Sequence, residues 1–190
     1  MYKSIESAKT KDLPNKRKFA RIFRILSRIS YWIQLILGAV SAIVLFLVIF
    51  SRSATHSGAG IGIFLAMFSL IALGFRVYWT LRYRKTAKRL QRIDSQSQPS
   101  RTEIVEILRV GLTASLIGLL LAFIAAEISL IFTLAAAIAR PQSIAVYQRE
   151  QVIQTADLLL VLAQLNILGA HFFGAANSLG LLSWISKEET

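Results

Sequence analysis

Four long apolar stretches fill most of this chain, and they restrict its possible folds more than any other feature. They cover residues 31–50, 58–79, 107–139 and 155–185. Each holds about 20 residues or more, which is enough for a helix to cross a hydrocarbon core of about 30 Å. Only helices and closed β-barrels satisfy their backbone hydrogen bonds in a bilayer, and barrel strands would alternate apolar and polar residues. Runs such as IVLFLVIF do not alternate, so the sequence predicts an all-α integral membrane protein, a bundle of four transmembrane helices.

The basic residues gather on alternate sides of these stretches. Nine Lys or Arg precede the first stretch and seven lie between the second and the third, whereas the other two connections hold one and two. The positive-inside rule therefore predicts that both termini and the second connection are cytoplasmic. The aromatic residues that anchor helices at an interface agree with this topology; they are Tyr31, Trp32, Tyr78, Trp79 and Trp184.

Residues 16–30 have the pattern of an amphipathic helix. Phe19, Phe23 and Leu26 lie on an apolar face, and arginines such as Arg17 and Arg24 take the opposite face. This pattern favours a helix that lies on the inner leaflet, with a basic targeting peptide as the alternative. The predicted division is a basic cytoplasmic segment with an amphipathic interfacial helix at residues 1–30, followed by a four-helix transmembrane domain at residues 31–185.

The third apolar stretch is longer than one crossing needs. Its 33 residues would extend about 50 Å as a helix. The helix is therefore expected either to tilt and project beyond the bilayer or to bend near Ala125, Ala126 and Glu127. Ser100 with Glu103 three positions later has the spacing of a capping box, which predicts the start of this helix.

Polar residues inside the apolar stretches are the candidates for function, because polar groups are costly at membrane depth. Asp157, Gln164, His171 and Ser178 are spaced by seven and so share one face of the last helix, and Glu127 lies toward the outer end of the third. Carboxylates and imidazole suit a divalent metal or a proton, which makes Glu127, Asp157, Gln164 and His171 candidate metal ligands along a transport path. The alternative is that these side chains join helices by hydrogen bonds. Arg76, about a turn from the inner interface, is expected to snorkel toward it.

The sequence contains no recognisable catalytic or nucleotide-binding motif. P-loop, GxSxG and HExxH patterns are all missing, so we expect neither an enzyme nor a covalently held cofactor. The net charge of +12 flanks the membrane stretches, which favours anionic lipid headgroups over nucleic acid as the counter-charge. The chain has no cysteine, which excludes disulfides and thiolate metal sites.

Parts of three stretches resemble one known family. The resemblance is carried by the runs ISYWIQLILG at 29–38 and LRVGL at 108–112, and by Ala156, Asp157, Gln164, Asn166 and the run AHF at 170–172. These residues are similar to the chloroplast inner-envelope family called permease in chloroplasts and to its cyanobacterial homologues. Glu127 stands where this family leads us to expect a neutral polar residue.

The resemblance implies a multi-pass protein of the cyanobacterial plasma or thylakoid membrane. Members of that family have been linked to iron uptake, and the plant members also to protein import. The first hypothesis is a permease-like protein for iron or another divalent cation, acting as a homo-oligomer. The second is a non-catalytic subunit or assembly factor of a larger photosynthetic or protein-translocation complex.

Overall fold

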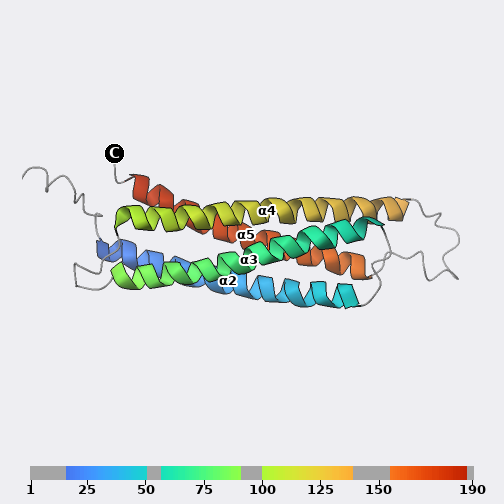
Figure 1. Cartoon of the computed structure of the whole chain (residues 1–190), viewed down its shortest axis with the longest axis horizontal. Helices are drawn as coiled ribbons and strands as arrows, with labels where there is room; N and C mark the ends of the chain where they lie inside the picture. The colour runs from blue at the N-terminus through green and yellow to red at the C-terminus, as the bar shows by residue number, and fades with distance from the viewer. Residues whose placement is uncertain (1–15, 51–56, 91–99, 139–154, 188–190) are drawn as a thin grey trace, which may run out of the picture.

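Four long helices run side by side along the molecule (Figure 1). The computed structural model describes residues 16–50, 57–90, 100–138 and 155–187. These residues form α2 (Lys16–Phe50), α3 (Ser57–Leu90), α4 (Arg101–Ile138) and α5 (Thr155–Lys187). All four are long and apolar enough to cross a membrane, which confirms the predicted fold class of a four-helix integral membrane protein.

Successive helices run in opposite directions and close into a bundle. Going round it, α2 packs on α3, α3 on α4, α4 on α5 and α5 on α2, while α3 and α5 also touch across the middle. The apolar part of α5 is 44% buried, against 22% for α2. The last helix therefore lies deepest in the bundle, and its polar residues have the most opportunity to contact other helices.

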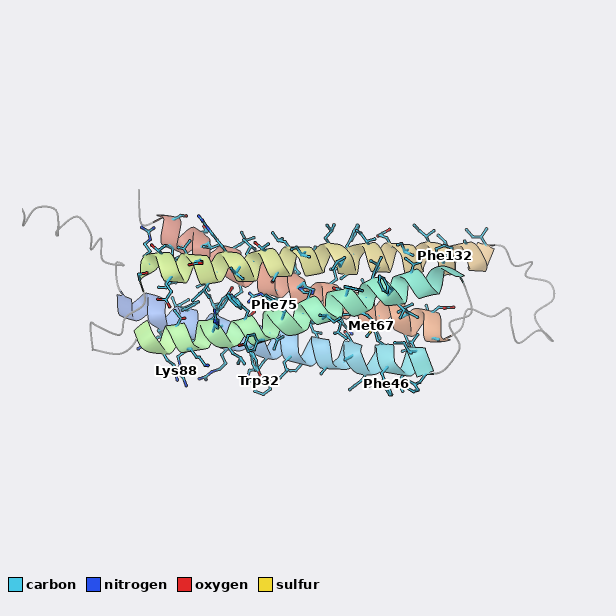
Figure 2. The ribbon with its side chains drawn as sticks, viewed as in Figure 1. Trp32, Phe46, Met67, Phe75, Lys88 and Phe132 are labelled. Atoms are coloured by element: carbon cyan, nitrogen blue, oxygen red, sulfur yellow. The ribbon has the colours of Figure 1, made fainter. Side chains whose placement is uncertain are left out.

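The outside of the bundle is apolar, and its interior contains many polar side chains among the buried apolar ones. Trp32, Phe46 and Phe132 point away from the bundle (Figure 2) and are 54%, 58% and 43% exposed. The buried polar side chains include serines and threonines from every helix, together with Gln34, Arg76, Gln164 and His171; Ser41, Ser69, Thr80, Ser115 and Ser178 are among the hydroxyl residues. Lipid tails are a suitable solvent for the outside, whereas the polar groups require partners in the interior.

The amphipathic residues 16–30 are helical, and they form the first turns of α2 instead of a separate helix. Neither glycine nor proline occurs between residues 16 and 37 to interrupt the helix. Phe23 lies in an apolar cluster at the end of the bundle where α2 begins and α3 ends, which we call the inner end, the opposite end being the outer end. Its ring centroid is 5.9 Å from that of Tyr83. This packing joins the segment to the bundle. Residues 1–15 lie outside the described residues.

The long α4 is one unbroken helix of 38 residues. The backbone N–H of Glu103 donates to Ser100 Oγ at 3.2 Å, as expected for the predicted N-cap. The helix continues through Ala125 and Glu127 to Ile138 and reaches past the ends of its neighbours (Figure 1). Of the two expectations for this segment, the structure has the projecting helix. The predicted outer loop at 140–154 lies outside the described residues.

Candidate functional site

A line of polar side chains from α5 faces the interior of the bundle. Asp157 is 7% exposed, and Gln164, His171 and Ser178 are fully buried. The seven-residue spacing that placed them on one helical face therefore corresponds to the buried face. We call these four residues the polar column.

At the outer level of the column, Gln164 joins three helices. Its Nε2 donates to Ser129 Oγ of α4 at 2.8 Å and to the carbonyl of Gly62 in α3 at 3.2 Å. The amide oxygen Oε1 is buried and has no hydrogen-bond partner among the described residues. Gln164 therefore holds the helices together through its nitrogen and keeps one acceptor unused.

His171 lies at the middle level of the column and, like Gln164, makes its hydrogen bond through one of its two polar side-chain atoms. Its Nε2 is 3.1 Å from the carbonyl oxygen of Ser69 in α3. A carbonyl can only accept, so in the neutral ring Nε2 carries the proton and Nδ1 keeps its lone pair. Nδ1 is buried without a partner in the described ranges. The ring therefore presents a nitrogen lone pair inside the bundle.

Gly118 of α4 provides the space for this ring. A Cβ added at Gly118 would overlap the imidazole and would lie 2.6 Å from Nδ1. The carbonyl of Gly118 also accepts a hydrogen bond of 2.7 Å from Ser69 Oγ. The three helices α3, α4 and α5 thus meet closely at the level of His171.

Arg76 lies at the inner level and is fully buried, so the expectation that it snorkels to the interface is wrong. Its Nε donates to Ser115 Oγ at 2.7 Å, and Nη1 donates to Thr80 Oγ1 at 3.0 Å. Its Nη2 donates to the Gly174 carbonyl at 3.0 Å and to Ser178 Oγ at 2.9 Å. The guanidinium stays inside because partners on its own helix and on two others satisfy all three nitrogens.

The acceptors around Arg76 are neutral hydroxyl and carbonyl groups. The guanidinium carbon also lies 4.9 Å from the centroid of the Tyr83 ring, a cation–π contact. No ion pair between Arg76 and an acidic side chain occurs in the part of the chain that the structure describes. The inner half of the bundle therefore contains a positive charge without a carboxylate partner, and this charge repels a cation.

Gln34 of α2 completes the inner level. Its Nε2 donates to Ser30 Oγ at 3.0 Å, while Oε1 is buried and unpartnered within the described residues. It faces Gly174 of α5, where an added Cβ would lie 2.5 Å from Gln34 Nε2 and 2.8 Å from Ser115 Oγ. A glycine is therefore needed for α2, α4 and α5 to approach one another here.

The four residues predicted as metal ligands do not meet. Glu127 is exposed on the lipid-facing side of α4, whereas Asp157, Gln164 and His171 face the interior of the bundle. Members of the column that are seven residues apart are separated by about 10 Å along the helix. Within the described ranges no three or more His, Cys, Asp or Glu gather where they could hold a metal ion. The geometry offers single ligands in succession, not a metal cage.

Sequence reasoning missed the central role of Arg76, although a signal was present. Gly62, Ser69, Arg76 and Tyr83 of α3 are spaced by seven, as are the members of the polar column. Each of these residues contacts the column or its supporting glycines. Two matching seven-residue series on different helices would have indicated that they face each other.

Among the surface hollows lined by described residues, two lie at the inner end of the bundle. One of about 480 Å³ lies between α3 and α4 and is lined by Tyr78, Arg82, Lys85 and Glu103 among others. The other, about 670 Å³, lies between α4 and α5 beside Arg101 and Arg109. Neither hollow reaches Gln164 or His171, so neither connects the polar column with solvent.

Comparison with known proteins gives two matches that extend over most of the chain. The family model described as "Protein of unknown function (DUF3611)" matches residues 13–186. The protein called "Protein TIC 21, chloroplastic" of Arabidopsis thaliana is 33% identical over 171 residues, which cover 87% of this chain and 57% of that protein. The chain therefore spans a little over half the length of this curated relative. No solved structure matches.

Proposed function

We propose a permease-like function for this chain, which belongs to the family described as "Protein of unknown function (DUF3611)". Its resemblance to the chloroplast permease family is confirmed. The protein would assist the passage of iron or another divalent cation. Asp157, Gln164 and His171 would be the residues that a cation meets in turn. The relative's name alone does not supply this function, so the proposal rests on the geometry of the column.

The observation that carries the proposal is the pair of unused acceptors in the column. Gln164 Oε1 and His171 Nδ1 are buried and unpartnered among the described residues. Polar atoms buried in a protein nearly always have a partner, and an exception requires an explanation. Amide oxygen and neutral imidazole nitrogen are both ligands for divalent transition metals. Two such acceptors on one buried face, below the Asp157 carboxyl at the outer end of α5, support transient binding of a cation.

Arg76 supports a gated path rather than an open one. A cation that moves inward from His171 would next approach the guanidinium, and like charges repel strongly where the dielectric is low. Passage therefore requires a second state in which Arg76 is displaced or in which its partners Ser115 and Ser178 move apart. In the state described here the inner half is closed to cations.

Orientation and location are part of the proposal. The basic residues at the inner ends of α2, α3 and α4 support cytoplasmic termini under the positive-inside rule. These residues would also contact anionic lipid headgroups. We place the protein in a cyanobacterial plasma or thylakoid membrane, without catalytic activity of its own.

The test is transport of ferrous iron into liposomes by the purified protein. The double variant Asp157→Ala with His171→Ala is expected to lose uptake, and Phe172→Ala, a lipid-facing neighbour that is 57% exposed, is expected to keep it. Circular dichroism and size-exclusion chromatography of each variant establish that it is folded. Equal uptake by the double variant and the wild type would contradict the assignment of the path. Absence of uptake by folded wild-type protein would contradict the function.

A second candidate function is that of a non-catalytic membrane subunit or assembly factor. The observation that favours it is that Gln164, Arg76 and Ser69 all donate hydrogen bonds that join one helix to another. A bundle of this kind can serve as a rigid scaffold for other membrane proteins. Native sizing after gentle solubilisation, with metal analysis, separates the two: co-migration with a large complex without metal supports the subunit, and a homo-oligomer with iron supports the permease.

A further inference from the structure

Glu127 is a carboxylic acid on the lipid-facing side of α4. Its side chain is exposed, and its exposed neighbours on the same surface are Phe123, Leu130 and Ile131. No hydrogen bond or ion pair to Glu127 occurs among the residues that the structure describes. An acidic group that faces lipid tails without a partner requires an explanation.

Its depth is fixed by the contacts of Ser129, two residues further along α4. Ser129 bonds Gln164, which lies nine residues inside the start of α5 at Thr155. Because α4 runs toward that end, Glu127 lies two residues deeper than Ser129, or about 16 Å from the outer end of α5. In the other direction, the exposed Arg109 of α4 is 18 residues away, or about 27 Å. A side chain with two methylene groups cannot reach water at either boundary.

The other three helices show that this position is exceptional. At the same depths, the exposed residues of α2 from 29 to 50, of α3 from 60 to 75 and of α5 from 158 to 179 are all apolar or glycine. A carboxyl group exposed at membrane depth thus occurs, within the described residues, on α4 and not on its neighbours. We therefore expect another protein surface to cover the lipid-facing side of α4.

Glu127 belongs to a regular line on that face. Exposed residues recur every seven positions on α4, at Glu106, Thr113, Leu120, Glu127 and Leu134. The same spacing occurs on α5 at Leu158, Leu165, Phe172 and Leu179, so the carboxyl groups, and not the spacing, distinguish the line on α4. A seven-residue repeat is the period with which two helices pack side by side at a small crossing angle. We call this line the α4 seam. The other long face of α4 is already occupied by α3 and α5, so none of the described helices of this chain covers the seam.

We propose that the α4 seam is the contact between two copies of this chain, paired in parallel about a two-fold axis along the membrane normal. Two copies inserted in the same orientation hold Glu127 at the same depth, and residues near such an axis meet their own counterparts. A protonated carboxyl group is both donor and acceptor, so the two Glu127 side chains can hydrogen-bond each other.

The inner end of the seam argues for a second copy over an unrelated partner. Glu106 and Arg109 are exposed there one turn apart. In a parallel two-fold pair, Glu106 lies opposite the partner's Arg109, and the reverse contact forms as well. The seam thus complements itself in charge at the inner end and in hydrogen bonding at Glu127. This pairing does not depend on whether a cation crosses the bundle.

Cross-linking tests the surface directly, because the chain contains no native cysteine. Leu120→Cys and Leu134→Cys place a thiol on the seam, whereas Ile71→Cys on α3 and Leu165→Cys on α5 place one on other lipid-facing surfaces. Full-length protein in phospholipid vesicles is oxidised with copper phenanthroline. We expect disulfide-linked dimers from the two seam variants and not from the controls. Equal cross-linking at all four positions, or none on the seam, would overturn the proposal.

The role of the carboxyl group is measured separately by energy transfer between labelled copies as lipid is added. Glu127→Leu should weaken association about 3- to 20-fold, the range for one hydrogen bond between membrane helices. Glu127→Gln should stay within about twofold of wild type, because an amide also donates and accepts. Unchanged association of Glu127→Leu would overturn the role of Glu127. Seam cysteines that cross-link to a different protein instead of a second copy would overturn the choice of partner.

Discussion

Replacing Gly118 with alanine is expected to destabilise the bundle, because the imidazole of His171 occupies the space that a methyl group would need. An added Cβ would overlap the ring and lie 2.6 Å from Nδ1. The ring is held in place by its bond to the Ser69 carbonyl at 3.1 Å. It can move away only if it gives up that bond or forces α4 and α5 apart.

The magnitude follows from the cost of overpacking. One extra methyl group in a well-packed interior costs about 1 to 3 kcal/mol, and loss of the imidazole bond adds about 0.6 kcal/mol. We therefore expect Gly118→Ala to lower the free energy of unfolding by about 2 to 4 kcal/mol. Gly74→Ala is the matched control, because an added Cβ there has nothing within 4 Å. It should be neutral, or stabilise by up to about 1 kcal/mol through helix propensity.

Unfolding in mixed micelles by titration with SDS, followed by tryptophan fluorescence, measures both variants. The decisive comparison is a double-mutant cycle with His171→Ala. In the His171→Ala variant the imidazole is gone and an added methyl group at position 118 has room. Gly118→Ala should therefore cost less than about 0.5 kcal/mol in the His171→Ala variant. An equal cost of Gly118→Ala with and without the imidazole would refute the assignment of the clash to His171.

Three further predictions concern other levels of the bundle, each measured by the same unfolding titration. Arg76→Lys should destabilise by about 2 kcal/mol, because an ammonium group cannot reproduce the bonds to Ser115 and Ser178 from separate nitrogens; stability equal to wild type would contradict the hub role of Arg76. Tyr83→Phe removes the hydroxyl that lies 3.2 Å from Ser178 Oγ and 3.5 Å from the Leu108 carbonyl oxygen and should cost about 0.6 to 1 kcal/mol; stability equal to wild type would contradict a role of this hydroxyl in joining the helices. Ser100→Ala should cost about 1 kcal/mol by removing the N-cap of α4, whereas Thr102→Ala, at an exposed position two residues further on, should cost much less.

The sequence was sufficient to predict the membrane fold, because apolar length and the distribution of charge both act locally. Four stretches were predicted to cross the bilayer, and four helices are long and apolar enough to do so. The seven-residue spacing on α5 identified the buried face of that helix, since a polar residue at membrane depth turns toward a partner. The N-cap at Ser100 could also be predicted from the sequence, because it depends on residues three positions apart.

The positions of Arg76 and Glu127 depended on contacts that no local pattern contains. Arg76 is held by Ser115 and Ser178, which are 39 and 102 residues away in sequence, so its nearness to the interface was a poor guide. The sequence prediction grouped Glu127 with the acceptors of α5 because Glu127 and Asp157 both lie toward the outer ends of their helices. In the folded chain Ala125 and Ser129 take the inner face of α4, which turns Glu127 outward. Which side of a long apolar helix faces lipid is decided by packing against its neighbours.

The most direct test of the four-crossing bundle is labelling of single cysteines from one side of sealed vesicles. Arg21→Cys near the start of α2, Lys88→Cys near the end of α3 and Ser186→Cys near the end of α5 lie at one end of the bundle, and Gly60→Cys near the start of α3 and Ile138→Cys at the end of α4 lie at the other. The antiparallel course of the helices is drawn in Figure 1. A membrane-impermeant maleimide should label the first three from the same side and the last two only from the opposite side. Labelling of Arg21→Cys and Lys88→Cys from opposite sides would contradict the account.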